Sequence, residues 1–141
     1  AEHPFAGISH LLVPSFDDQG VAIIDGLSLT TRVVPRIADR QSYGVNYSPL
    51  SPNRAFVMNR ARRDVAVVDV QTGLAANVIQ MQGTTETAST TADGRYVVAT
   101  VSSENRVAVI DVLNESVVKV VEGVGAYPWS IVIPRGQNYC H

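Results

Sequence analysis

The stretch RVAVIDV, residues 106–112, is the third copy of one short pattern in this chain of 141 residues. Close copies are GVAIIDG at 20–26 and DVAVVDV at 64–70, so the spacing is 44 residues and then 42. Each copy is a run of Val, Ile and Ala followed by an aspartate, which is typical of a β-strand that enters a turn. A period of about 40–50 residues predicts stacked or radial repeats.

Four short segments recur in each cycle of the repeat. A strand such as YVVAT (96–100) leads through a polar turn to the repeated strand, and SVVKVVE (116–122) is an example of the segment that follows. A further short strand ending in Pro, Asp or Gly precedes each cycle, as in YPWSIVIPRG (127–136). Four antiparallel strands per repeat predict a propeller blade. The apolar runs are continuous, which favours strands covered on both faces.

The fold class that we predict is all-β, with β-propeller blades of four antiparallel strands and three such blades in this chain. A closed propeller has about four to eight blades, so three blades predict a ring that another chain or further sequence completes. The expected bounds are 1–42, 43–84 and 85–126 for the three blades, with the start of a further blade at 127–141.

We expect the apolar segment at 129–133 to be the first strand of that further blade. Its own later strands are not in the chain, and an exposed apolar strand edge invites aggregation. We therefore expect it to pair with the strand at 11–15, either in another chain, as a homo-oligomer, or in the remainder of a larger propeller. Trp129, the only tryptophan, is expected to pack between blades, and stacking on a ligand is the alternative.

The aspartate that closes each repeated strand has a structural explanation. Asp25, Asp69 and Asp111 stand where a strand enters a turn, and a carboxylate there can accept hydrogen bonds from the turn amides. We predict this role for all three rather than a catalytic one.

Two stretches resemble the YVTN-type β-propeller repeat: FVMNRARRDVAVVDVQTG (56–73) and DGRYVVATVSSENRVAVIDVLNESVVKVV (93–121). Each has the strand, polar turn and V-x-V-I-D strand of that family. The chain departs from the family at Pro14 and Met58, where the family has Thr, and Asn59 occurs only in the second repeat. The resemblance implies a surface-layer or periplasmic propeller. It implies no single activity, because propellers of this kind include quinoprotein, cytochrome and lactonase enzymes.

Composition excludes several classes of function. The net charge is −2, so the chain has no general attraction for nucleic acid or for acidic membranes. Aromatic residues make up 6%, too few for the stacking platforms that bind single-stranded nucleic acid. No apolar run reaches the roughly 18 residues of a membrane span. The single cysteine excludes an intrachain disulfide.

An arginine-rich turn is the candidate partner-binding site. Arg60, Arg62 and Arg63 lie together in the sequence, and Arg54 stands just before the preceding strand. Such a group can hold a carboxylate or a phosphate of a ligand or partner. Asp64 neutralises part of the charge, and a solvated turn is the alternative explanation.

Four residues near the chain ends are candidate metal ligands. His3 is the third residue of the chain, and a free amine, two amide nitrogens and an imidazole suit Cu(II) or Ni(II). Cys140 and His141 place a thiolate beside an imidazole, and the histidines, His10 included, could converge at the seam of the ring. The ending resembles the tail of the C-x-x-C-H haem motif but lacks its first cysteine. Copper and haem are therefore the cofactors considered, and exposed terminal residues are the alternative.

These features favour a non-catalytic propeller scaffold, periplasmic or extracellular, that binds a protein or a small molecule through its loops. An alanine at the first position is typical of a processed, exported chain. The alternative is a propeller subunit in which haem, a quinone or copper supplies redox chemistry. A metal-dependent hydrolase would need carboxylates or histidines on the inner strands, and Glu86 is the only one there.

Overall fold

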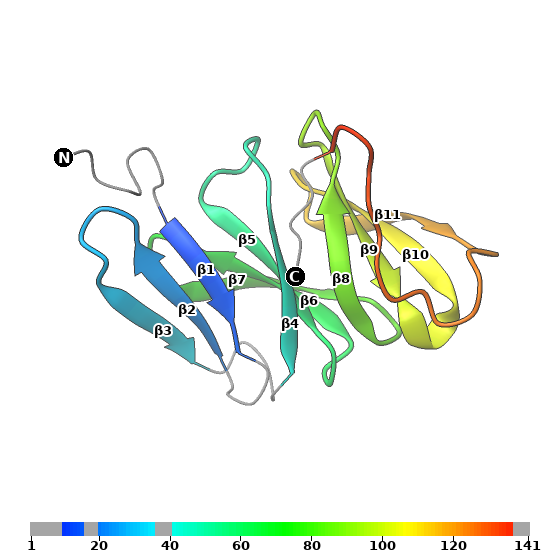
Figure 1. Ribbon diagram of the computed structural model, residues 1–141, viewed down its shortest axis with the longest axis horizontal. Coiled ribbons are helices and arrows are strands. Elements are labelled where there is room, and N and C mark those ends of the chain that lie inside the picture. Colours follow the sequence, from blue (N-terminus) through cyan, green and yellow to red (C-terminus); the bar gives the residue numbers. More distant parts are fainter. Residues whose placement is uncertain (1–9, 16–19, 36–40, 137–141) are drawn as a thin grey trace.

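The computed structural model describes residues 10–15, 20–35 and 41–136. Apart from a single 3-10 turn at Ser102–Glu104, every regular element there is a β-strand. No helix in this part of the chain is long and apolar enough to cross a membrane. The strands form three antiparallel sheets that lie side by side (Figure 1). The prediction of an all-β fold with unclosed propeller blades is confirmed.

Within each sheet, strands adjacent in sequence are hydrogen-bonded neighbours. The first sheet holds β1 (His10–Pro14), β2 (Gly20–Asp25) and β3 (Thr31–Pro35). The second holds β4 (Ser42–Tyr47), β5 (Arg54–Asn59), β6 (Asp64–Asp69) and β7 (Leu74–Gln80). The third holds β8 (Thr85–Thr90), β9 (Tyr96–Val101), β10 (Arg106–Asp111) and β11 (Ser116–Val121). The edge strand β4 lies between β1 and β8 (Figure 1).

The hydrophobic core consists of two layers, one on each side of the second sheet. Ala55 and Val57 of β5 pack toward the first sheet, whereas Phe56 and Met58 pack toward the third. All four side chains are fully buried. A strand that is buried on both faces is apolar at successive positions, which explains the continuous apolar runs in the sequence.

The turn after each repeated strand is built in the same way three times, with the hydrogen bonds predicted for the aspartates. The carboxylates of Asp25, Asp69 and Asp111 each accept bonds from the amides two and three residues further on, at 2.7–3.0 Å. Each aspartate carbonyl accepts a further bond from the amide four residues on. The bond from the amide three residues on contributes most to lowering the pKa of each carboxyl below its usual value.

The prediction of a strand at 129–133 is wrong for this chain, because the structure has no strand between β11 and Gly136. The segment nevertheless lies along β8, where the hydroxyls of Thr87 and Ser89 donate to two of its carbonyls at 2.7 and 2.8 Å. A strand requires a ladder of backbone hydrogen bonds, and β8 reaches this segment through side chains. In the described part of the chain β1 pairs with β2 alone, so pairing of 129–133 with 11–15 stays a prediction about a second chain or a longer one.

Candidate functional site

A polar and aromatic cluster lies where β4, β8 and the segment 127–133 meet. Tyr43 on β4, Glu86 on β8 and Trp129 on the segment are each 43 residues apart. The three inner segments of the repeat therefore contribute one side chain each to the same cluster.

The backbone contacts between these inner segments repeat with the same spacing of 43 residues. Gly44 approaches the Glu86 carbonyl so closely that a Cβ on it would lie 2.6 Å from the oxygen. At the matching position Thr87 Oγ1 donates to the Trp129 carbonyl at 2.7 Å. The segment 127–133 thus lies where the inner strand of a further blade would lie.

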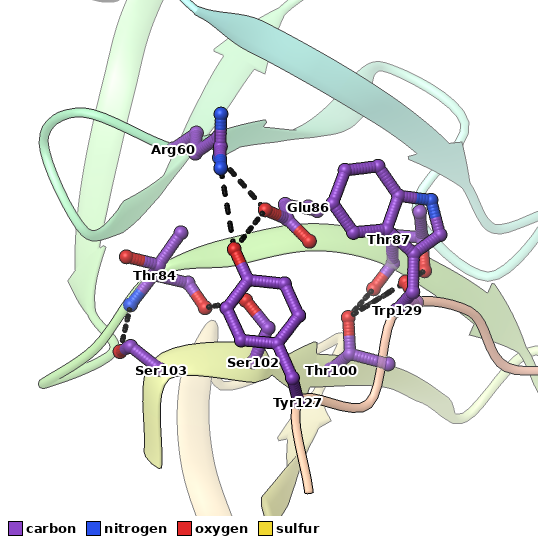
Figure 2. A network of polar contacts seen from close by, with 9 residues as sticks. All are labelled: Arg60, Thr84, Glu86, Thr87, Thr100, Ser102, Ser103, Tyr127 and Trp129. Carbon is purple, nitrogen blue, oxygen red and sulfur yellow. Dashed lines mark hydrogen bonds and ion pairs between the residues drawn. The ribbon is translucent and has the colours of Figure 1, made fainter. Parts of the chain in front are cut away.

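The carboxylate of Glu86 is at the centre of the cluster (Figure 2), and its side chain is fully buried. Oε1 makes an ion pair with Arg60 Nε at 2.7 Å and accepts a hydrogen bond from the Tyr127 hydroxyl at 3.3 Å. Oε2 is also buried, but no described residue donates to it. A buried carboxylate oxygen without a donor is energetically costly. Oε2 is therefore a buried acceptor whose donor is not among the described residues.

Arg60, just after β5, links the second sheet to the third and to the segment 127–133 (Figure 2). In addition to its pair with Glu86, its Nη2 donates to the Tyr127 hydroxyl at 3.2 Å. Its guanidinium carbon lies 6.0 Å from the centroid of the Trp129 ring. The bond to Tyr127 contributes most to raising the pKa of Arg60 above its usual value, and the charge of Glu86 adds to it. The cation is thus held in place by three separate contacts.

Three aromatic rings frame the ion pair. Tyr43 meets Trp129 edge to face, with centroids 5.6 Å apart and an interplanar angle of 84°. Tyr127 lies nearly parallel to Trp129, at 6.2 Å and 25°. The exposed fractions are 43% for Trp129 and 46% for Tyr127. The prediction that Trp129 is buried between blades is therefore wrong for the described part of the chain, where the ring is only partly covered.

Polar contacts from the third sheet fix the position of the aromatic segment. Asn105 accepts a hydrogen bond from the Tyr127 amide at 2.8 Å through its Oδ1. Its backbone is left-handed, with φ of 55°, a region that asparagine tolerates better than most residues. Thr100 Oγ1 lies 3.4 Å from the Trp129 carbonyl and adds a second anchor.

The cluster has the chemistry of a recognition site. Glu86 offers the free lone pairs of Oε2, and Trp129 and Tyr127 offer ring faces for stacking. Arg60 already balances the charge of the carboxylate, so a second cation would meet repulsion as well as attraction. A neutral donor such as an amide or a hydroxyl fits this electrostatic environment best.

The four arginines predicted to bind a partner do not come together in the structure. Arg54 begins β5 at the opposite end from Arg60 and forms ion pairs with Asp69 and Glu115, two turn residues at 3.9 and 3.5 Å. Two further arginines lie in the turn after Arg60. Arg62 pairs with Asp64 at 3.1 Å, and Arg63 is exposed with a left-handed backbone, φ of 58°. Their role in partner binding stays a prediction, and only Arg60 belongs to the cluster.

Of the four candidate metal ligands, only His10 lies within the described residues. It begins β1 and lines a hollow of about 300 Å³ together with Ile23, Asp25, Thr30, Thr31 and Arg32. His3, Cys140 and His141 lie outside those residues. The described part of the chain contains no group of three or more His, Cys, Asp or Glu side chains that could hold a metal ion. The copper and haem hypotheses stay predictions.

Sequence reasoning identified Arg60 and Glu86 separately and missed that they form an ion pair. It missed Tyr43 and Tyr127 altogether. The period of 43 residues between inner segments was the available signal, because it places Tyr43, Glu86 and Trp129 at equivalent positions. Tyr127 follows no comparable pattern.

The structure resembles large proteins of known structure. Kuenenia stuttgartiensis hydrazine synthase superposes with a TM-score of 0.77 at 19% identity, over 86% of this chain and 35% of that chain. The structure of apo AztD from Citrobacter koseri gives 0.66 at 14% identity, over 88% and 34%. The dihydro-heme d1 dehydrogenase NirN in complex with DHE gives 0.67 at 19% identity, over 86% and 25%.

The fold is that of a β-propeller. At these identities the likeness shows the fold alone, and the chain spans about a third or less of the length of these proteins. No family model matches the chain, and no curated protein sequence matches it. The assignment to YVTN-type repeats therefore stays a prediction from the sequence.

Proposed function

We propose that this chain forms blades of a non-catalytic β-propeller scaffold that binds its partner at the cluster around Glu86. The observation that carries the proposal is the fully buried carboxylate whose Oε2 has no donor among the described residues. The group that completes it carries a neutral N–H or O–H donor. Such a group is found on an amide of a protein partner and on many small molecules.

Two features of the surroundings support a binding role. Trp129 and Tyr127 are nearly half exposed beside the carboxylate, and half-exposed aromatic rings are typical of recognition surfaces. Arg60 anchors both the carboxylate and the rings, so the site is held in shape before a partner arrives. A site formed in advance binds with a smaller loss of conformational freedom.

The location and the assembly are part of the same proposal. We place the protein in the periplasm or outside the cell, on the resemblance of its repeats to YVTN-type propellers. The unclosed arrangement of three sheets fits either an oligomer or part of a larger propeller, because the propellers of known structure extend well beyond the region that this chain covers.

The fluorescence of Trp129 tests the proposed site directly, because Trp129 is the only tryptophan in the chain. N-acetylglycinamide serves as a probe that presents amide donors without charge. We expect a saturable change in emission, with half-saturation in the millimolar range that is usual for so small a ligand. Ethylammonium, which carries a positive charge, should give a weaker response because of Arg60.

Two variants separate binding at the cluster from general solvent effects. Glu86→Met removes the acceptor and should abolish the saturable response. Glu104→Gln changes an exposed glutamate in the 3-10 turn and should leave the response unchanged. An equal response in wild type and Glu86→Met would show that the carboxylate takes no part in binding.

A further inference from the structure

The interface between the first and second sheets and that between the second and third sheets are formed by the same positions of the repeat; we call each interface a joint. The third sheet carries these positions on a face that no other described sheet covers. Val34, Ile79 and Val121 occupy one equivalent position on the outer strand of each sheet, paired with the first part of β2, β6 and β10. Their exposed fractions are 3% for Val34, 6% for Ile79 and 38% for Val121. Val34 and Ile79 are covered by the next sheet, and Val121 is not.

Across each joint, a polar side chain of the outer strand of one sheet donates to the aspartate turn of the next sheet. Arg32 of β3 donates to the carbonyls of Val70 and Gln71, in the aspartate turn of the second sheet, at 2.6 and 2.8 Å. At the equivalent place in β7, Asn77 Nδ2 donates at 3.4 Å to the Glu115 carbonyl, in the aspartate turn of the third sheet.

Lys119 is the third member of this series. Its partner across the ladder is Val109, just as Ile23 is the partner of Arg32 and Val67 that of Asn77. The side chain of Lys119 is exposed, and no described residue makes a hydrogen bond or an ion pair with it. A cation therefore stands where the next sheet would present the carbonyls of an aspartate turn.

The first sheet carries the complementary free face. Val57 of β5, which packs toward the preceding sheet, is fully buried, whereas its equivalent Val13 of β1 is 49% exposed. On the next strand, Ile24 occupies the position of the fully buried Val68 and is only partly buried. The turn after Asp25 belongs to this same sheet, so its carbonyls are placed to accept from a cation such as Lys119.

The inner edges are complementary as well. The first sheet has three strands, and no described residue pairs with the free edge of β1. The segment 127–133 lies at an inner-strand position, and no described strand pairs with it. The register of this pairing can be read from the third sheet, where Ser89 of the inner strand pairs with Val98 of the next strand. The residue equivalent to Ser89 in segment 127–133 lies 43 residues further on and is Val132. The residue equivalent to Val98 in the first sheet lies two repeats earlier, 44 plus 42 residues back, and is Leu12. The repeat thus sets Val132 opposite Leu12.

We propose that a second copy of this chain packs its first sheet against the third sheet of the first copy, head to tail. Segment 127–133 of one copy completes the three-stranded sheet of the other, and Lys119 donates to the turn after Asp25 of the second copy. Two such joints close a ring of six blades, which lies within the range of about four to eight blades seen in propellers. A second copy is the occupant because this one chain carries both halves of the joint.

Sedimentation velocity and light scattering on the full chain test the closure. The expected particle is a dimer of roughly 30 kDa, twice the 15.2 kDa of the chain. Val121→Asp places a charge on the free face and should give monomer. Val120→Asp is the matched control, because Val120 is 41% exposed on the same strand but pairs with Ala108, whose side chain faces the second sheet. Val120→Asp should remain a dimer.

Lys119 provides a finer test of the same joint. Lys119→Ala should weaken dimerisation about tenfold, the effect of losing a charge-assisted hydrogen bond. Lys119→Arg should restore it, because Arg32 makes the same contact inside the chain. The melting temperature of the monomer should change little in either variant, since the side chain is exposed and no described residue makes a hydrogen bond or an ion pair with it.

Cross-linking tests the register, in a Cys140→Ser background. Leu12→Cys with Val132→Cys should form a disulfide between chains, because the two residues face each other across the proposed ladder. Val13→Cys with Val132→Cys should not, because neighbouring residues of a strand point to opposite faces. A wild type that stays monomeric at high micromolar concentration overturns the proposal, and so does a dimer that Val120→Asp and Val121→Asp affect equally. Open filaments instead of dimers would overturn the closed ring.

Discussion

The two ends of the sheets are built according to different rules. At the end where the aspartates lie, all three turns share one set of hydrogen bonds and one left-handed position. At the opposite end, the equivalent inner positions hold Tyr43, Glu86 and Trp129, which differ in size, charge and burial. β5 joins the two: Arg54 at its start pairs with residues of the repeated turns, and Arg60 after its end pairs with Glu86.

This contrast separates the part of the sequence that builds the fold from the part that is specific to one site. A residue type that recurs in every sheet has a structural role common to all sheets, and here the aspartate closes a turn. A residue that occurs in one sheet only has a role at that one place. The buried ion pair of Arg60 and Glu86 belongs to this second kind, because buried ion pairs add little stability compared with apolar side chains of the same volume.

The largest effect that we expect comes from the core that the repeated strands share. Phe56 has the largest of the fully buried side chains in the described residues and packs between the second and third sheets. Phe56→Ala should lower the free energy of unfolding by about 3–5 kcal/mol, through lost burial and the cavity left behind. Urea denaturation measures this. Leu74→Ala, at a position that is 66% exposed, should change it by less than about 0.5 kcal/mol.

The Arg60–Glu86 pair should respond unequally to loss of either partner. Arg60→Met leaves a fully buried carboxylate without its cation and should cost about 3 kcal/mol. Glu86→Met leaves a guanidinium whose side chain is 32% exposed and still bonded to Tyr127, so it should cost about 1 kcal/mol or less. Urea denaturation of the two variants decides the matter. Equal losses would mean that the carboxylate holds the fold at this end as the aspartates do at the other.

The turns that contain the three aspartates should make the stability of the protein depend on pH. The folded-state pKa values of Asp25, Asp69 and Asp111 lie below the usual value of 3.8, chiefly because turn amides donate to the carboxylates. Their contribution is therefore fully present above about pH 4 and is lost as the pH falls through the lowered values. We expect the melting temperature to fall steeply below pH 4. Changing the three residues to asparagine should lower the melting temperature at pH 7 and flatten this acid dependence.

Much of the fold could be predicted because the repeat states the same information three times. The spacing of the strand that ends in Asp25, Asp69 and Asp111, together with the segments that recur around it, predicts antiparallel blades. The structure has eleven such strands in three sheets. The segment 129–133 was expected to be a strand and is not one, for a physical reason that the repeat cannot express. A strand needs a neighbour that hydrogen-bonds along its edge, and none of the described strands pairs with this segment.

The site could be predicted only in part because its contacts join residues that occur once. Arg60 and Glu86 are 26 residues apart and Tyr127 lies another 41 residues on, so no local pattern links them. Burial of the carboxylate results from the packing of β8 against β4, which composition does not reveal. The spacing of 43 residues among Tyr43, Glu86 and Trp129 was visible, but only the structure shows that these positions face one another.

The smallest effect concerns the left-handed position shared by the three turns. Leu29 and Gly73 occupy the same place, with φ of 59° and 71°. A residue with a side chain loses about 1–2 kcal/mol in this region, which glycine adopts without strain. Leu29 is 47% exposed, so removing its side chain loses little packing. Leu29→Gly should therefore raise the free energy of unfolding by about 0.5 kcal/mol, after allowance for the greater freedom of glycine in the unfolded chain.

The control for this last change lies two residues earlier in the same turn. Leu27 is 77% exposed, and its φ is not positive. Leu27→Gly relieves no strain and adds only freedom to the unfolded chain, so it should lower the free energy of unfolding by about 0.5–1 kcal/mol. Opposite signs for the two glycine variants in urea denaturation would show that the shared turn, and not the leucine side chain, determines the backbone at Leu29. If both variants change the free energy of unfolding in the same direction, the backbone of this turn relaxes when its sequence changes. The three turns would then be less alike than their shared hydrogen bonds indicate.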